Sequence, residues 1–138
     1  MADGAASGRA CIGVRKRVRV IGITEEEVTL KLVPEQGALI RECLYFLHEA
    51  PEDALCFFVD ASSGEILQLA RRFDREESRE YVLGVRGLRL AYLSLSHALS
   101  QFSREEDFHT RIGWYRDDAR DLAAALWVAL ADNSVDGC

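Results

Sequence analysis

Two stretches of this chain repeat the same order of apolar residues, and this internal similarity constrains the fold more than any other feature. It lies in spacing more than in identity. At an offset of about 52 residues, the apolar set Leu39, Cys43, Leu47 and Ala50 recurs as Ala91, Leu95, Leu99 and Phe102. One residue further in register, Leu55, Phe57 and Val59 recur as Phe108, Thr110 and Ile112, and Ile66, Leu69, Ala70 and Phe73 recur as Ala119, Leu122, Ala123 and Leu126. The spacing predicts two strand–helix–strand–helix halves, at about 28–73 and 80–131.

A β-hairpin is predicted ahead of these halves. From Ile12 to Val20 most even positions are apolar and alternate with Arg15, Arg17 and Arg19, which is the period of a half-buried strand. After a polar turn around Thr24 to Glu27, the apolar residues Val28, Leu30 and Leu32 also alternate with polar ones. The expected fold class is therefore α+β, with an N-terminal β-hairpin followed by two pseudo-repeated halves in a single domain.

Local signals place the other elements. Pro34 suits the first turn of a helix that Pro51 ends, and the segment LCFFVD (55–60) favours a buried strand because it is rich in aromatic and branched residues. The next segment is ambiguous, since the turn residues at 60–64 suit a hairpin, whereas Ser62 and Glu65 have the spacing of a helix capping box. The internal similarity favours the helix. Residues 81–85 are expected to form a strand, and the last amphipathic helix is expected to start near Asp117.

Length and composition indicate one domain. A chain of 138 residues, 49% of them hydrophobic, buries roughly two-thirds of its unfolded surface without needing a metal or disulfides. We expect the domain to span 11–132, with flexible tails at 1–10 and 133–138. The sequence has neither an apolar run long enough to span a membrane nor the apolar stretch of a signal peptide, and its four cysteines are scattered. These features predict a cytoplasmic protein with reduced, mostly buried thiols.

Charge is unevenly distributed along the chain. Residues 1–22 hold five basic groups and one acidic group, whereas residues 23–138 hold 12 basic and 22 acidic groups. An acidic body discourages nonspecific binding to nucleic acid and suits a basic protein partner, because complementary charge speeds encounter. The sequence thus favours a protein partner, with nucleic acid a poor candidate, and it leaves a homodimer open.

No motif of catalysis or cofactor binding is recognisable. The sequence lacks metal-ligand spacings such as H-E-x-x-H or paired C-x-x-C. It also lacks the G-x-S-x-G turn that carries the nucleophilic serine of many hydrolases. We therefore expect no metal, no cofactor and no enzymatic activity. An alternative is a small enzyme whose site combines His97, His109 and a carboxylate from separate elements. Asp107 and His109 share one face of a predicted strand, but this pair alone does not make a metal site.

A second alternative rests on the segment from Leu83 to Leu90. Its pattern, an apolar residue, Gly84, Val85, Arg86, Gly87 and a later apolar residue, resembles the core of KH domains. In that family the glycine loop approaches single-stranded nucleic acid. The resemblance covers about eight residues, and it implies an RNA-binding module in which Arg86 and Arg89 supply positive charge.

Two groups of residues are candidates for contact with a protein partner. Trp114, Tyr115 and Arg116, just before the last helix, belong to the residue types that are enriched in interface hot spots. Arg15, Arg17 and Arg19 form a basic stripe on one predicted strand face. The sequence is thus interpreted as a small acidic, non-enzymatic interaction protein, such as an adaptor, an inhibitor or an immunity-type protein.

Overall fold

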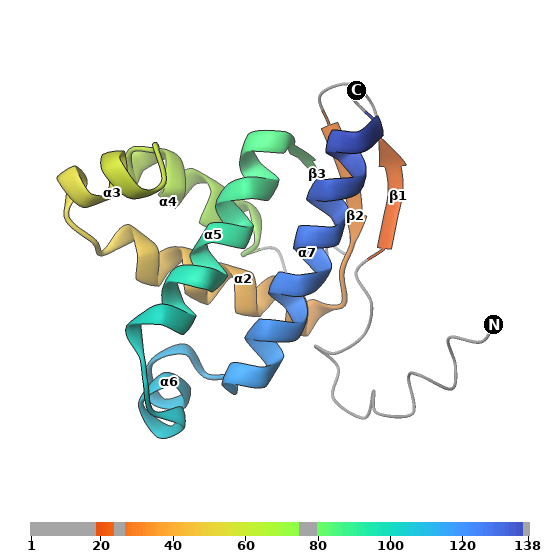
Figure 1. Cartoon of the computed structure of the whole chain (residues 1–138). Coiled ribbons are helices and arrows are strands. Elements are labelled where there is room, and N and C mark those ends of the chain that lie inside the picture. The colour runs from red at the N-terminus through yellow and green to blue at the C-terminus, as the bar shows by residue number, and fades with distance from the viewer. Residues whose placement is uncertain (1–18, 24–26, 75–79, 137–138) are drawn as a thin grey trace, which may run out of the picture.

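The computed structural model describes residues 19–23, 27–74 and 80–136, which form a mostly helical α+β arrangement with a small antiparallel sheet (Figure 1). In chain order the elements are β1 (Arg19–Ile23), β2 (Glu27–Lys31), α2 (Pro34–His48), α3 (Glu52–Phe58), α4 (Ser63–Arg72), β3 (Glu80–Gly84), α5 (Val85–Gln101), α6 (Glu105–Ile112) and α7 (Arg116–Asp136). The order strand, long helix, short helix, helix therefore occurs twice. It occurs first as β2–α2–α3–α4 and then as β3–α5–α6–α7.

The sheet has the strand order β1-β2-β3, and both neighbouring pairs are antiparallel. Thr29 lies opposite Val82 at the centre of the β2–β3 pair. Val28 and Leu30 are buried, whereas Glu27 and Lys31 are exposed, because successive side chains of a strand point to opposite faces. The strands expected around 28–32 and 81–85 are confirmed in this form.

The expected N-terminal strand and β1 overlap only in part. β1 begins at Arg19 and continues to Ile23, with a bulge between Val20 and Gly22 where it pairs with β2. Residues 12–18 of the expected strand, including Arg15 and Arg17, lie outside the described residues, as do residues 24–26 of the expected turn. The tail expected at 1–10 lies outside them too. At the other end, α7 continues to Asp136, into the stretch expected to be a tail.

Local hydrogen bonds explain where α2 and α4 begin. Pro34 occupies the first helical position of α2, and the Gln36 side-chain oxygen accepts the Val33 N–H at 2.9 Å. In α4 the Ser62 hydroxyl accepts the Glu65 N–H at 3.1 Å. This bond satisfies one of the amide groups that a helix start leaves without an internal partner. The helical alternative for residues 63–73 is thereby confirmed.

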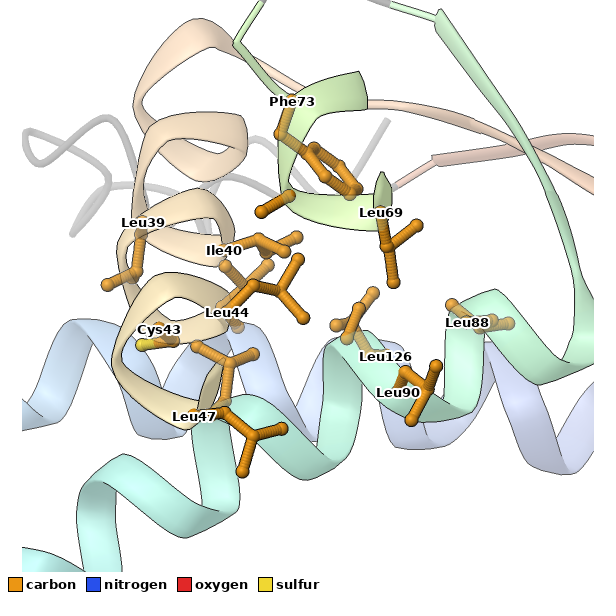
Figure 2. Close-up of a cluster of buried hydrophobic side chains, with 14 of the residues drawn as sticks. Leu39, Ile40, Cys43, Leu44, Leu47, Leu69, Phe73, Leu88, Leu90 and Leu126 are labelled. Atoms are coloured by element: carbon orange, nitrogen blue, oxygen red, sulfur yellow. The ribbon is translucent and has the colours of Figure 1, made fainter. Parts of the chain in front are cut away.

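The core lies between α2, α4, α5 and α7 (Figure 2). Its members are buried apolar side chains. They include Leu39, Ile40, Cys43, Leu44 and Leu47 of α2, Leu69 of α4, Phe73 after it, Leu88 and Leu90 of α5, and Leu126 of α7. Each large side chain contributes about 1.5–3 kcal/mol through burial. The packing of these helices therefore supplies most of the stabilisation.

The buried strand expected at 55–59 is wrong, because these residues belong to helix α3. Leu55 and Val59 are buried one helical turn apart, whereas Phe57 and Phe58 are exposed. The helix ends at Phe58, and the chain then turns at Asp60, whose φ of 56° lies in the left-handed region and whose N–H donates to the Leu55 carbonyl at 3.0 Å. Aromatic residues favour strands in general, but here the backbone closes helical hydrogen bonds, such as the one from the Val59 N–H to the Leu55 carbonyl at 2.9 Å.

The strand expected at 108–112 is wrong for the same reason, since residues 105–112 form α6. Phe108 and Ile112 are the buried pair, and Gly113, with φ 96°, ends the helix. Asp107 and His109 consequently do not share a strand face. Two positions apart on a helix, their side chains point in different directions.

The described cysteines are both free thiols. Cys43 is buried, and burial together with the charge of Glu42 raises the pKa of its thiol well above the ordinary value. Cys56 is exposed on α3, which differs from the expected burial. Cys11 and Cys138 lie outside the described residues.

We expect two helical glycines to respond oppositely to alanine. At Gly87 of α5 an added Cβ meets Leu69 and Leu83 at 3.7 Å, which is ordinary contact. The gain in helix propensity should therefore raise the free energy of unfolding by about 0.5–1 kcal/mol. At Gly37 of α2 the added Cβ lies 3.1 Å from the Tyr81 hydroxyl, and Tyr81 is buried and stacked on Phe73.

Crowding at Gly37 should cancel or exceed the propensity gain. Urea denaturation of Gly87→Ala and Gly37→Ala measures both effects. An equal stabilisation by the two substitutions would contradict the close packing of α2 on Tyr81.

Candidate protein-interaction site

Two adjacent aromatic residues of α3 are exposed on the surface. Phe57 is 93% exposed and Phe58 is 54% exposed. Single exposed apolar residues are common on proteins, but adjoining large ones beside a concave apolar surface mark interaction sites. The sequence reasoning missed this pair, because it placed residues 55–60 in a buried strand. A signal that could have found it is the acidic pair Glu52 and Asp53, which suits the first turn of a helix.

The two phenylalanines border a groove between α3, α5 and the end of α2, which we call the α3–α5 groove. Its lining is almost entirely apolar and consists of Leu47, Ala50, Ala54, Leu55, Phe57, Phe58, His97 and Gln101. Its volume is about 240 Å³. This is below the range of about 300–1,000 Å³ that small-molecule pockets occupy. The groove therefore suits one or two protruding side chains better than a metabolite.

His97 projects from α5 into the aromatic part of the groove. Its ring centroid lies 5.9 Å from that of Phe58 and 5.3 Å from that of Phe46. Partial burial among these rings lowers the pKa of His97, because desolvation disfavours the imidazolium. The imidazole is thus neutral at physiological pH and adds to the apolar character of the groove.

The chain around α3 is strongly acidic. From Phe46 to Ala70 the sequence contains five carboxylates and neither lysine nor arginine. Glu52, Asp53 and Asp60 are exposed at the start and end of α3. Glu49 forms an ion pair with Arg111 of α6, whose guanidinium lies 5.1 Å from the centre of the Phe46 ring. The α3 side of the groove therefore carries negative charge next to apolar surface.

The structure places Trp114 and Tyr115 elsewhere. Trp114 is half-buried and lines a separate cavity of about 380 Å³ together with Pro34, Glu35, Ala38, Arg41, Phe73 and Tyr81. Tyr115 is 55% exposed, and its ring lies 4.5 Å from that of His109. Its N–H donates to the Asp118 carboxylate at 3.3 Å, which helps to start α7.

Arg116 is engaged within the chain. Its guanidinium donates to the carbonyls of Leu99, at 3.1 Å, and Phe102. Its backbone N–H donates to the Glu105 carboxylate at 2.8 Å. Arg116 thus ties the end of α5 and the start of α6 to α7. Of the basic stripe, only Arg19 is described, as the first residue of β1.

The glycine pattern that resembles a KH domain lies at a junction between a strand and a helix. Gly84 ends β3 and caps α5 with φ −69°, a value open to any residue, and Gly87 lies inside α5. Arg86 forms an ion pair with Glu65 of α4, and Arg89 is exposed. The Arg86 guanidinium also donates to the Asp60 carbonyl. A phosphate would have to displace both partners of Arg86.

The histidines of the alternative enzyme site contact different side chains. His97 contacts Phe46 and Phe58, whereas His109 contacts Tyr115. The groove that contains His97 has no carboxylate among its lining residues. Among the residues that the structure describes, no three His, Cys, Asp or Glu side chains are grouped as ligands for a metal ion.

No helix in the described part of the chain combines the length and apolar character that a membrane crossing requires. Comparison with protein-family models, with curated proteins and with solved structures finds no match for this chain.

We expect the burial of His97 to make stability depend on pH. The unfolded histidine takes up a proton near pH 6.5, at its ordinary pKa of about 6.5. The folded protein binds this proton only at lower pH, so the free energy of unfolding should fall as the pH drops from about 7.5 to 5.5. Urea denaturation at both values should show a smaller fall for His97→Gln. An NMR titration in which the His97 imidazole keeps its ordinary pKa would contradict the burial.

The ion pair between Arg86 and Glu65 gives a second prediction about pH and stability, at a more acidic pH. The hydrogen bond from Arg86 lowers the pKa of Glu65. The stabilisation from this shift is therefore present above the unfolded pKa of about 4.3 and disappears as the pH falls through the lower folded value. Arg86→Gln should return the pKa of Glu65 toward its ordinary value in a carbon-detected NMR titration. It should also be less stable than the wild type at neutral pH, with the difference shrinking in acid. An unchanged Glu65 titration would contradict the pairing.

Proposed function

We propose that this protein is a small, acidic, non-enzymatic interaction module of the adaptor, inhibitor or immunity type, and that it binds a protein partner through the α3–α5 groove. The observation that carries this proposal is Phe57, a phenylalanine 93% exposed beside an apolar groove. Covering one such side chain contributes about 1.5–3 kcal/mol to association. Aromatic anchors of this kind dominate the energetics of protein interfaces.

Two further features support the proposal. His97 and His109, which an enzyme of the alternative kind would bring together, contact different residues. The negative charge on α3 suits a basic protein and repels nucleic acid. A cytoplasmic location is part of the proposal, and the free thiols of Cys43 and Cys56 fit a reducing compartment.

We also propose that the two halves of the domain are related by a pseudo-two-fold axis. The offset that aligns Leu55 with Phe108 also aligns Thr29 with Val82, and these two residues face each other in the β2–β3 register. An antiparallel pair centred on equivalent residues is what a two-fold relation requires. The same offset aligns the left-handed residue after α3, Asp60, with the left-handed residue after α6, Gly113.

This relation provides an internal control for the site. The positions equivalent to Phe57 and Phe58 are Thr110 and Arg111 of α6. A short helix of the same architecture thus forms with polar residues at these places. The aromatic pair is not needed to build α3, which supports a role in binding.

The test is a comparison of two variants in affinity capture from a lysate of the source cells. Phe57→Thr introduces the residue of the equivalent position, and Val128→Thr changes a valine that is 55% exposed on α7. Both should leave stability within about 0.5 kcal/mol of the wild type, as thermal unfolding can verify. We expect a stoichiometric, nuclease-resistant protein partner to be retained by Val128→Thr and lost by Phe57→Thr.

Three results would contradict the proposal. The first is a partner that Phe57→Thr retains at wild-type levels. The second is recovery of RNA that nuclease treatment abolishes, which would favour the glycine segment at 84–87 instead. The third is the absence of any protein recovered by the wild type in stoichiometric amount.

A further inference from the structure

We infer that the occupant of the α3–α5 groove is an amphipathic helix of the partner, with two large apolar side chains one turn apart and lysine or arginine beside them. This inference rests on the proposed function, and it names the chemistry of the partner at the same site. It is built from the shape of the groove, the composition of its walls and the charge along one rim.

Shape favours a helix over an extended strand. The walls of the groove are two helices, α3 and α5, and the residues that line it are side chains. A strand binds mainly by adding main-chain hydrogen bonds to a sheet edge, whereas a helix binds by laying apolar side chains between helices. The sheet lies apart from α3: β1 and α3 are at opposite ends of the view in Figure 1. The groove therefore offers side-chain contacts and no sheet edge.

The composition of the walls determines the anchors. About 240 Å³ of space lies between apolar residues of α2, α3 and α5. Leu, Met or Phe side chains at positions i and i+4 of one helix lie on the same face, so two of them can enter one groove together. Phe57 and Phe58 then cover these anchors from the α3 side, and His97 covers them from α5.

Charge determines the flanking residues. Glu52 and Asp53 are exposed in the first turn of α3, next to Ala54 of the groove lining, whereas α5 between Leu90 and Gln101 contains no charged residue. A helix seated in the groove would thus meet negative charge along one side and neutral surface along the other. Lysine or arginine on the matching side of the occupant forms favourable pairs there, and acidic residues are repelled.

A second copy of this chain fits the groove less well than a basic partner. The body of the chain, residues 23–138, holds 22 acidic groups against 12 basic ones, so two bodies repel each other. The chain's own basic segment, Cys11–Val20, alternates basic and apolar residues with a period of two, which is the pattern of a strand. Both occupants are included below as competing outcomes.

The experiment titrates the purified full-length protein into fluorescently labelled synthetic peptides and follows anisotropy. The main probe is a peptide of about 15 residues made of Leu, Lys and Ala, with Leu at i and i+4 positions on one face. The first control has the same composition with the leucines dispersed around the helix. The second replaces each Lys by Glu, and the third is the segment 11–20 of this chain.

We expect saturable binding of the main probe, weaker by about tenfold or more for both designed controls. Phe57→Thr should weaken this binding by about tenfold, whereas Val128→Thr should leave it unchanged. Asp53→Asn should weaken it at low salt and have little effect at high salt, because salt screens exposed charges. These results together would support a basic amphipathic helix as the occupant.

The inference would be overturned if the dispersed-leucine control bound as tightly as the main probe or if the Glu peptide bound more tightly. It would also be overturned if Phe57→Thr left the affinity for the main probe unchanged. Stronger binding of the 11–20 peptide would assign the groove to the chain's own basic segment, and concentration-dependent dimerisation that Phe57→Thr abolishes would assign it to a second copy. If the peptides fail while a captured partner still depends on Phe57, only the helix inference falls. If Phe57→Thr also retains the captured partner at wild-type levels, the proposed function is contradicted as well.

Discussion

The register of the β2–β3 pair is the constraint on which the rest of the structure depends. With Thr29 opposite Val82, the buried faces of both strands point to the same side, where Val28 and Leu30 meet Tyr81 and Leu83. A slip of one residue would turn every one of these side chains to the outer face. Each strand leads into a long helix, so the same pairing brings α2 beside α5. Helix α4 then packs on α2, and α7 packs on α5, as the core in Figure 2 shows.

The long elements could be predicted from the sequence, because their patterns persist over several turns or alternations. Val28 and Leu30 alternate with polar residues, and the apolar spacing from Leu39 to Leu47 continues over more than two helical turns. For the ambiguous segment after Asp60, the similarity to the last helix correctly favours a helix. In each case the local capping residues and the burial pattern agree, which is the consistency expected of a foldable sequence.

The short helices α3 and α6 could not be predicted from these patterns. Over five residues, a buried pair at i and i+4 also fits an alternating strand, since both periods place the first and fifth residues on one face. Phe57 favours the strand, which is wrong, because it occupies the middle position whose side chain a strand would bury. What distinguishes the two is the left-handed residue at the end, Asp60 or Gly113, and its conformation follows from packing as much as from sequence.

The strand wrongly predicted at 55–60 is also the reason why the sequence does not reveal the candidate site. Phenylalanine is usually buried, so a reading of sequence patterns places it in the core by default. Phe57 departs from that default without disturbing the helix, and in the proposed two-fold relation its counterpart is Thr110. If the halves are equivalent, the fold tolerates a polar residue there, and its stability gives no reason for an aromatic one. Places where consistent local rules fail are expected to be functional, and in this chain the clearest failure lies at the border of the α3–α5 groove.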